Sequence, residues 1–494
     1  MSFIGFGSTW TAIQPAFVAV YSSASIAIIA MLRYALPCMA CLALAACGRP
    51  PTELEQVKAH NELIVITRNS PTTYFEGPDG PTGLEYDLAK RFADYLGVEL
   101  RMVVPANFSD ILPLTALGNA NLAAAGLTIT DKRKEKVRFG PVYQEITPQL
   151  VYRSGSTRPK TLADLDGILE VVAGSSHEEQ LEKLQEDYPA LAWQTNAELE
   201  SDELLALVWQ QLIEYTIADS NEVAVNRRFY PELKPAFDIS PPKPLAWAFP
   251  RSKDDSLFNA AKAFFKTIRK DGRLERLIDR YYGHIGEFDY VGTRRYQAHI
   301  EQRLPQYRDL FIKAASEVGM DWRLLAAIGY QESHWNSNAV SPTGVRGIMM
   351  LTKAAAKDLG IKDRNDPAQS IRGGARYFAN MLQRMPERIP EPDRTWLALA
   401  AYNVGLGHLE DARILTQKNE GNFDRWVDVK ENLPLLSKKK WFQQTRHGYA
   451  RGQEPVRYVD NIRTYYDILV WLTGKDSEDK QVVQEPPQFD SPAL

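Results

Sequence analysis

The sequence predicts a multidomain protein in which an α/β half is followed by a mainly α half. Three observations support this prediction. The chain has 494 residues, too many for one ordinary hydrophobic core. Its 44% hydrophobic and 24% charged residues are typical of a globular protein. Short β-branched runs alternate with helical spacing up to about residue 287, and helical spacing returns after it.

Residues 1–46 are predicted to be an upstream extension followed by an export signal. A short basic start at Met31 and Arg33 precedes an apolar run over residues 34–42, and small residues follow up to Cys47. This order is typical of a cleaved signal peptide, and translation can also start at Met31. An alternative is an uncleaved anchor over residues 17–46, which is long enough to span a bilayer if Arg33 is tolerated.

All three cysteines, Cys38, Cys41 and Cys47, lie near the amino terminus, so no disulfide or cysteine-based metal site can hold the folded domains. The sequence Leu44-Ala45-Ala46-Cys47 resembles a bacterial lipobox, which implies cleavage before Cys47 and lipidation of its thiol. The non-acidic Gly48 implies sorting to the outer membrane of a Gram-negative bacterium, on its periplasmic face. Residues 47–60 would then be the lipidated cysteine and a spacer.

Residues 61–287 are predicted to form the α/β module. Apolar and β-branched runs at residues 63–67 and 97–104 are typical of strands, and residues 86–96 between them have helical spacing. The alternation continues through further apolar runs at residues 123–128, 171–174 and 215–218. Such alternation predicts mixed sheets.

Three motifs of this module carry a family resemblance. They are Gly83-Leu84-Glu85-Tyr86-Asp87, Gly126-Leu127-Thr128-Ile129-Thr130-Asp131-Lys132-Arg133 and Ala218-Asp219-Ser220. Together they resemble the family 3 periplasmic solute-binding proteins, two-lobed receptors that close on amino acids. The resemblance implies that Arg133 grips an α-carboxylate and that Asp219, in the second lobe, takes the α-ammonium.

The resemblance also implies supporting roles around that clamp, with Tyr74 as a wall and Thr128 and Ser175 as hydrogen-bond donors. Physical chemistry agrees with the clamp, because arginine offers a planar fork that matches a carboxylate. In the alternative interpretation Arg133 is one solvated surface charge in the charged run over residues 131–138. The resemblance implies an amino-acid ligand, and we also expect that a peptide or muropeptide with free amino and carboxylate ends can use the clamp.

The second half contains a carboxylate at the end of an apolar helix. Asp321 is placed to cap this helix, and Leu325, Ile328 and Glu332 then fall on one face. Glu332 would therefore point where core residues point. Loss of hydration there raises the pKa of a carboxyl group, as a general acid near neutral pH requires. The alternative is a helix-terminal glutamate satisfied by a neighbouring arginine.

Four segments in register carry a second resemblance. They are Glu332-Ser333, Gly347-Ile348-Met349-Met350, Ala401-Tyr402-Asn403, and Tyr458-Val459 with Ile462 and Tyr465. They resemble the catalytic domain of family 1 lytic transglycosylases, goose-lysozyme-like enzymes that cleave the glycan strands of peptidoglycan. The resemblance implies a mainly α, lysozyme-like domain, which we expect over residues 288–474. Met350 stands where most relatives have glutamine.

The predicted reaction follows from the number of carboxylates. An ordinary glycosidase needs two, whereas residues 341–350 and 401–407 contain no Asp or Glu. The resemblance implies that Glu332 acts twice, first as acid and then as base towards the C6 hydroxyl of N-acetylmuramic acid, and leaves a 1,6-anhydro end. Further residues are expected to position the acid and the N-acetyl group or to line the glycan groove: Ser333, Asn403, Met349, Tyr402 and Tyr458. The alternative for the groove residues is core packing, which the sequence favours for Met349 and Met350.

We therefore predict a murein lytic transglycosylase of the outer membrane whose partners are peptidoglycan strands. No His-Glu-x-x-His or related spacing is present, so no metal and no cofactor are expected. The net charge of -4 gives no indication of a nucleic-acid partner. Two alternatives stay open: a goose-lysozyme-type hydrolase that uses Glu332, and a wall-binding sensor without catalysis.

The junction between the halves is predicted to be short and ordered. Residues 257–282 and 294–318 both have helical spacing, and a glycine-punctuated passage separates them. Residues 475–494 lack apolar periodicity and are predicted to be disordered.

Overall fold

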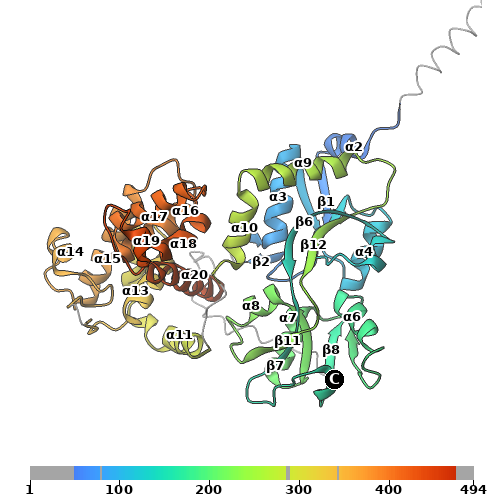
Figure 1. Ribbon diagram of the computed structural model, residues 1–494, viewed down its shortest axis with the longest axis horizontal. Helices are drawn as coiled ribbons and strands as arrows, with labels where there is room; N and C mark the ends of the chain where they lie inside the picture. Colours follow the sequence, from blue (N-terminus) through green and yellow to red (C-terminus); the bar gives the residue numbers. More distant parts are fainter. Residues whose placement is uncertain (1–48, 78–79, 285–289, 342–343, 474–494) are drawn as a thin grey trace, which may run out of the picture. The chain divides into compact units, whose positions relative to one another are not determined.

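The computed structural model describes residues 49–77, 80–284, 290–341 and 344–473 (Figure 1). By its contacts the chain divides after Gln56, and the features below lie in the unit that begins at Val57. The predicted signal, the lipidation site Cys47 and the predicted disordered tail lie outside the described residues. Within the described ranges, no helix is both long enough and apolar enough to cross a membrane.

The first lobe of the α/β module is built on a mixed five-stranded sheet with the order β4-β1-β5-β12-β6. Strand β1 pairs in parallel with β4 and β5, and β12 runs antiparallel to β5 and β6. Leu63 and Val65 of β1 are fully buried, as the apolar run predicts. The strands are β1 (Glu62–Ile66), β4 (Glu99–Val103), β5 (Leu122–Ala123), β6 (Arg138–Ile146) and β12 (Lys243–Phe249).

The second lobe has its own mixed five-stranded sheet, with the order β11-β7-β10-β8-β9. Its strands are β7 (Pro148–Arg153), β8 (Leu169–Val172), β9 (Gln194–Asn196), β10 (Tyr215–Asp219) and β11 (Leu233–Asp238). The chain passes between the lobes twice, from β6 to β7 and from β11 to β12, and Figure 1 shows these strands continuing from one sheet into the other. The prediction of a two-lobed α/β module with mixed sheets is confirmed.

Helices follow the strands of both lobes. The described elements are α2 (Glu53–His60), α3 (Leu84–Leu96), α4 (Ile111–Ala116), α5 (Asp131–Lys134), α6 (Ser176–Leu184), α7 (Ser201–Gln210), α8 (Ser220–Asn226), α9 (Ser256–Lys270) and α10 (Arg273–Tyr282), with a small hairpin of β2 (Phe75–Gly77) and β3 (Gly80–Thr82). The run expected to be one helix over residues 257–282 is two helices. Gly272, at φ 72°, separates α9 from α10, because a left-handed backbone residue cannot continue a helix.

The described residues from 290 onward form helices and isolated bridges, without a strand. The helices are α11 (Tyr290–Gln302), α12 (Arg308–Ser316), α13 (Trp322–Ser333), α14 (Lys353–Asp358), α15 (Pro367–Arg384), α16 (Asp393–Val404), α17 (Leu406–Lys418), α18 (Trp426–Asn432), α19 (Lys439–Phe442) and α20 (Gln453–Thr473). The helical run expected over residues 294–318 is interrupted by a short 3-10 turn at Leu304–Gln306, which contains Pro305. The mainly α prediction is confirmed.

The core of this helical domain surrounds α13. Helix α13 packs against α20 and α12, and α16 packs against α20. Two glycines permit the close approach of the segment after α13. A Cβ on Gly374 of α15 would lie within 2.6 Å of the Met349 side chain, and one on Gly347 would lie 1.8 Å from the Arg364 carbonyl oxygen. These contacts hold the Gly347-Ile348-Met349-Met350 segment against α15 and against the Arg364 backbone.

Candidate active site

Glu332 lies in the last turn of α13, and local sequence explains its position. The Asp321 carboxylate caps the helix by accepting a hydrogen bond from the Arg323 backbone N–H. Leu325 and Ile328 are fully buried, as the spacing predicts. His334, at φ 52°, ends the helix in the left-handed conformation. Glu332 is half-buried at the same helix face, next to the core but open to solvent on one side.

Burial controls the protonation of Glu332. Loss of hydration raises the pKa of its carboxyl group to about 7. The Tyr458 hydroxyl, on α20, donates a hydrogen bond of 2.6 Å to Glu332 Oε1 and offsets part of this rise, because it stabilises the ionised form. No ion pair to Glu332 is found among the described residues. The carboxyl group can therefore both give up and take back a proton near neutral pH.

Tyrosines from two helices stand beside this carboxyl group. The rings of Tyr402 and Tyr458 are nearly parallel, with centroids 6.3 Å apart, and Tyr377 packs edge-on against Tyr402 at 5.1 Å. Burial, and then the negative charge of Glu332, raise the pKa of both Tyr402 and Tyr458 well above the ordinary range. Both hydroxyls thus keep their protons and act as neutral donors.

The structure places the other predicted residues in different surroundings. The Ser333 hydroxyl donates to the Gly329 carbonyl at 3.2 Å and accepts from the Asn336 N–H at 3.2 Å, so it holds the end of α13. Asn403 is exposed at the end of α16. Met349 is fully buried in the core, and its contribution near the site is a backbone carbonyl that accepts from the Tyr402 hydroxyl at 3.3 Å.

Glu332 is the one carboxylate that acts on Tyr402 and Tyr458 in the part of the chain that the structure describes. Among the described residues, no second carboxylate that could serve as a separate base influences these two tyrosines. The described residues also contain no group of three or more His, Cys, Asp or Glu side chains arranged to hold a metal ion. Tyr377 was not predicted from the sequence, and nothing in its local pattern distinguishes it from an ordinary helix residue.

The predicted receptor residues belong to the two lobes of the first module. Arg133 is buried, and its Nε donates to Glu179 Oε1 at 2.8 Å while its Nη2 donates to the Gly174 carbonyl at 3.1 Å. Asp219 is buried at the start of α8, and His177 Nε2 lies 2.9 Å from its Oδ1. The structure therefore gives each half of the predicted clamp a partner from the chain itself.

The sequence predicts three further residues as supports of this clamp. The Thr128 carbonyl accepts a hydrogen bond of 3.4 Å from Arg133, and the Ser175 hydroxyl caps α6 by accepting from the Glu178 N–H. Tyr74 donates to Glu76 and packs its ring against Tyr86 at 5.9 Å. None of these three lines the small cavity between the lobes, whereas Asp219 does.

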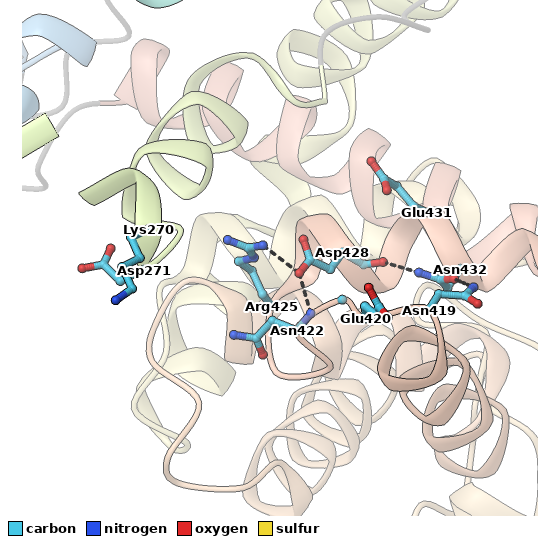
Figure 2. Close-up of a pocket in the computed structure, with 10 residues that line it drawn as sticks. Lys270, Asp271, Asn419, Glu420, Asn422, Arg425, Asp428, Glu431 and Asn432 are labelled. Atoms are coloured by element: carbon cyan, nitrogen blue, oxygen red, sulfur yellow. Dashed lines mark hydrogen bonds and ion pairs between the residues drawn. The ribbon is translucent and has the colours of Figure 1, made fainter. Parts of the chain in front are cut away.

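A separate polar pocket of about 650 Å³ lies away from both sites (Figure 2). Figure 2 shows its Asp428 carboxylate bonded to Arg425 and to the Asn422 backbone, and Asn419 bonded to Asn432. These bonds leave the buried Arg425 Nε without a partner among the described residues, and none of the tyrosines around Glu332 lines the pocket.

Two family models match the chain, one in each half. The family described as Transglycosylase SLT domain matches residues 309–424, and the family described as bacterial extracellular solute-binding proteins, family 3, matches residues 63–284. An arginine-binding protein from T. maritima, solved as a mutant crystal structure, has a TM-score of 0.43 and 23% identity over 47% of this chain and 99% of its own.

Two curated relatives cover most of the chain. A protein of Saccharophagus degradans named membrane-bound lytic murein transglycosylase F is 50% identical over 88% of this chain and 87% of its own length. One of Alkalilimnicola ehrlichii, named membrane-bound lytic murein transglycosylase F 1, is 52% identical over 86% of each chain. The chain therefore belongs to the membrane-bound lytic murein transglycosylase F family, and it is a peptidoglycan lytic transglycosylase.

Proposed function

We propose that Glu332 alone performs both proton transfers of the lytic transglycosylase reaction. As an acid it protonates the glycosidic oxygen, and the bond from that oxygen to C1 of N-acetylmuramic acid breaks. As a carboxylate it then removes the proton of the C6 hydroxyl of the same sugar, whose oxygen bonds to C1. The products are a free hydroxyl on the leaving N-acetylglucosamine and a 1,6-anhydro end, so no water is consumed.

The observation that carries this proposal is the pKa of Glu332, which burial raises to about 7 without an ion pair. A group that gives up a proton and takes one back works best when its pKa lies near the working pH. The hydroxyl of Tyr458 supports the second half of the cycle, because it stabilises the carboxylate that forms. The single carboxylate agrees with an internal hydroxyl as nucleophile.

The neighbouring residues fit supporting roles. Tyr402 and Tyr458 give the carboxyl group an apolar, aromatic wall on which a sugar can pack. Asn403, the exposed residue that follows Tyr402, can bond the N-acetyl group, whose carbonyl can assist at C1. Ser333 holds the helix end that carries Glu332.

Product analysis in isotope-labelled water tests the proposal. Purified sacculi are digested with the full chain, and the released muropeptides are weighed by mass spectrometry. We expect anhydro ends without label. A product heavier by one labelled water molecule would show that Glu332 activates water, as in a goose-type hydrolase.

We propose further that the amino-terminal module binds a peptide, muropeptide or amino-acid effector that regulates the catalytic domain. Helix α20 supports a connection, because it carries both Tyr458 and Arg463, whose Nη1 donates to the Asp279 carboxylate of α10 at 2.9 Å. Asp467 of the same helix pairs with Arg228 at 2.8 Å. Titration of candidate effectors, with binding and wall cleavage followed together, tests this; binding without any change in cleavage would contradict regulation.

Finally, we propose that lipid on Cys47 anchors the protein to the periplasmic face of the outer membrane. The lipobox resemblance supports this location, and the names of the relatives describe those proteins as membrane-bound. Cys47→Ala should remove lipid labelling and shift the protein from the membrane to the soluble periplasmic fraction. Unchanged labelling and fractionation would place the anchor elsewhere.

A further inference from the structure

The space between the two lobes is almost completely filled. The cavity there has a volume of about 10 Å³, which is room for about one water molecule. Its lining includes Arg68, Glu85, Gln144 and Asp219. An amino acid or peptide does not fit in this space, so the lobes are closed on the chain's own side chains.

Arg68 is the side chain that crosses from one lobe to the other. It follows β1 in the first lobe and is only 7% exposed. Its guanidinium group bonds to the Glu222 carboxylate on α8, and its Nη1 lies 3.4 Å from Glu200 at the start of α7. Both carboxylates belong to the second lobe. Arg68 therefore occupies the position between the lobes where a bound ligand would have to lie.

Carboxylates outnumber cations at this position. Burial lowers the pKa of Arg68, but Glu222, Glu200, Asp202 and Asp219 outweigh this effect and hold it above the ordinary range. Burial raises the pKa of Glu200 and Glu222, and Arg68 offsets part of each rise. Of these four carboxylates, Glu222 and Glu200 bond to Arg68, Asp219 pairs with His177, and Asp202 accepts hydrogen bonds from Ser70 and Asn226. Buried charges of one sign are costly unless a counter-charge remains with them.

The other arginine of this region does not correct the imbalance, because Arg133 is bonded to Glu179 and to the Gly174 carbonyl. The pairing around Arg68 is also incomplete. Its Nε and the Oε1 of Gln144 are buried and have no hydrogen-bond partner among the described residues, and both residues line the cavity. Buried polar atoms without partners indicate that a polar group of another molecule can be accommodated there.

We propose that Glu200, Asp202, Asp219 and Glu222 form a site for a cationic group, and that Arg68 occupies it as a built-in substitute when no effector is bound. The effector then carries an ammonium or guanidinium group that displaces Arg68 as the lobes open and close again. This inference rests on the proposed effector function of the module and names the chemical class that the module accepts.

Removal of Arg68 tests this directly. In detergent-purified full chain, Arg68→Ala should bind methylguanidinium at the vacated site, with a dissociation constant at least about tenfold lower than in the wild type, which must first displace Arg68. N-methylurea has the same shape without charge and should not bind. Arg138→Ala removes a surface arginine paired with Asp255, and it should behave as the wild type does. Thermal shift and calorimetric titration measure the binding of both compounds to the wild type and to each variant.

A second variant identifies the site. Arg68→Ala combined with Glu222→Gln should lose most of the gained affinity. If the single variant does not fold, restoration of folding by methylguanidinium and not by N-methylurea supports the proposal, and failure of both compounds overturns it. Equal binding of methylguanidinium to Arg68→Ala and to the wild type also overturns it.

The outcome is separable from that of the proposed effector function. If a muropeptide binds the wild type and changes wall cleavage but Arg68→Ala gains no cation binding, the cationic site is wrong and regulation stands. If Arg68→Ala binds methylguanidinium but no effector alters cleavage, the site stands and the regulatory proposal fails.

Discussion

Glu332 in the catalytic domain and Glu222 in the receptor module are both carboxylates that burial drives towards the protonated form. They differ in their partners. Glu222 bonds to the Arg68 guanidinium, whereas Glu332 bonds to the neutral hydroxyl of Tyr458. An arginine fixes the ionised state of an acid and ties two segments together. A neutral donor leaves the acid able to exchange its proton, which is what catalysis requires.

Glu85 adds a third case to this comparison. It is almost fully buried, and it accepts hydrogen bonds from the Tyr143 hydroxyl, from Trp247 Nε1 at 2.8 Å and from the Gly126 N–H at 2.9 Å. Burial raises its pKa and the three donors offset part of the rise. These contacts use both carboxylate oxygens, so Glu85 holds the first lobe together rather than exchanging protons. Burial alone therefore does not identify a candidate catalytic acid. A better candidate is a carboxylate that is also open to solvent and has few hydrogen-bond donors around it.

The largest expected effect is on turnover when the exchangeable proton is removed. Glu332→Gln keeps the shape of the side chain but cannot transfer a proton, and general acid-base catalysis contributes about 100-fold to 10,000-fold. We expect release of soluble muropeptides from sacculi to fall by that factor while sacculus binding persists. Glu317→Gln is the matched control, since Glu317 is a helix-end glutamate paired with Arg372. Activity of Glu332→Gln within a few fold of the wild type would exclude Glu332 as the acid.

The second prediction concerns the loss of the Arg68 cation. Without it, the buried carboxylates around this position, like Glu332, have no arginine partner. Arg68→Met keeps apolar volume but leaves the second-lobe carboxylates without a counter-charge, which should lower the free energy of unfolding by about 3 to 5 kcal/mol. The pKa values of these acids should rise further, so the lost stability should be small in acid and grow as the pH increases. Chemical denaturation at several pH values measures this, with Arg138→Met as control. An equal loss at every pH would contradict the charge argument.

The third prediction concerns the stability cost of burying Glu332, the proposed acid. Burial raises the pKa of Glu332 to about 7 from an ordinary value of 4.5, so the stabilising effect of its neutral form is fully present below pH 4.5 and is lost as the pH rises through 7. Glu332→Gln stays neutral and should therefore be more stable than the wild type at pH 8, by up to about 3 kcal/mol, and similar at pH 4.5. Thermal unfolding at the two pH values compares them. A variant less stable than the wild type at pH 8 would contradict burial as the cause.

The smallest expected effect is on the pKa of Glu332 when the neutral donor, the Tyr458 hydroxyl, is removed. Tyr458→Phe removes one hydrogen bond to a charged group, worth about 1.5 to 3 kcal/mol to the ionised form of Glu332. The pKa of Glu332 should rise, and the high-pH limb of the activity profile should move to higher pH. Tyr466→Phe is the control on the same helix, because the Tyr466 hydroxyl bonds to Asp321 at 2.9 Å and not to Glu332. An unmoved limb would show that Tyr458 does not set the protonation of Glu332.

Local patterns in the sequence determined the two halves of the fold and the position of the acid. Apolar alternation predicted strands that the structure places at Glu62–Ile66 and Tyr215–Asp219, and a capping Asp321 with buried Leu325 and Ile328 placed Glu332 on the core face of α13. These features depend on neighbours a few residues apart, which the sequence shows directly. The motif around Glu332 also carried the family resemblance that the relatives confirm.

Only the tertiary structure decided which side chains meet. Tyr458 reaches Glu332 across 126 positions of the chain, and Arg68 reaches Glu222 across 154. It also places Met349 in the core and pairs Arg133 with Glu179. The residue types alone fit either a ligand clamp or an internal ion pair, because an arginine bonds a ligand carboxylate and a glutamate in the same way. The tertiary fold determines which partner each ionisable side chain meets, and the partner determines the pKa and the function of that side chain.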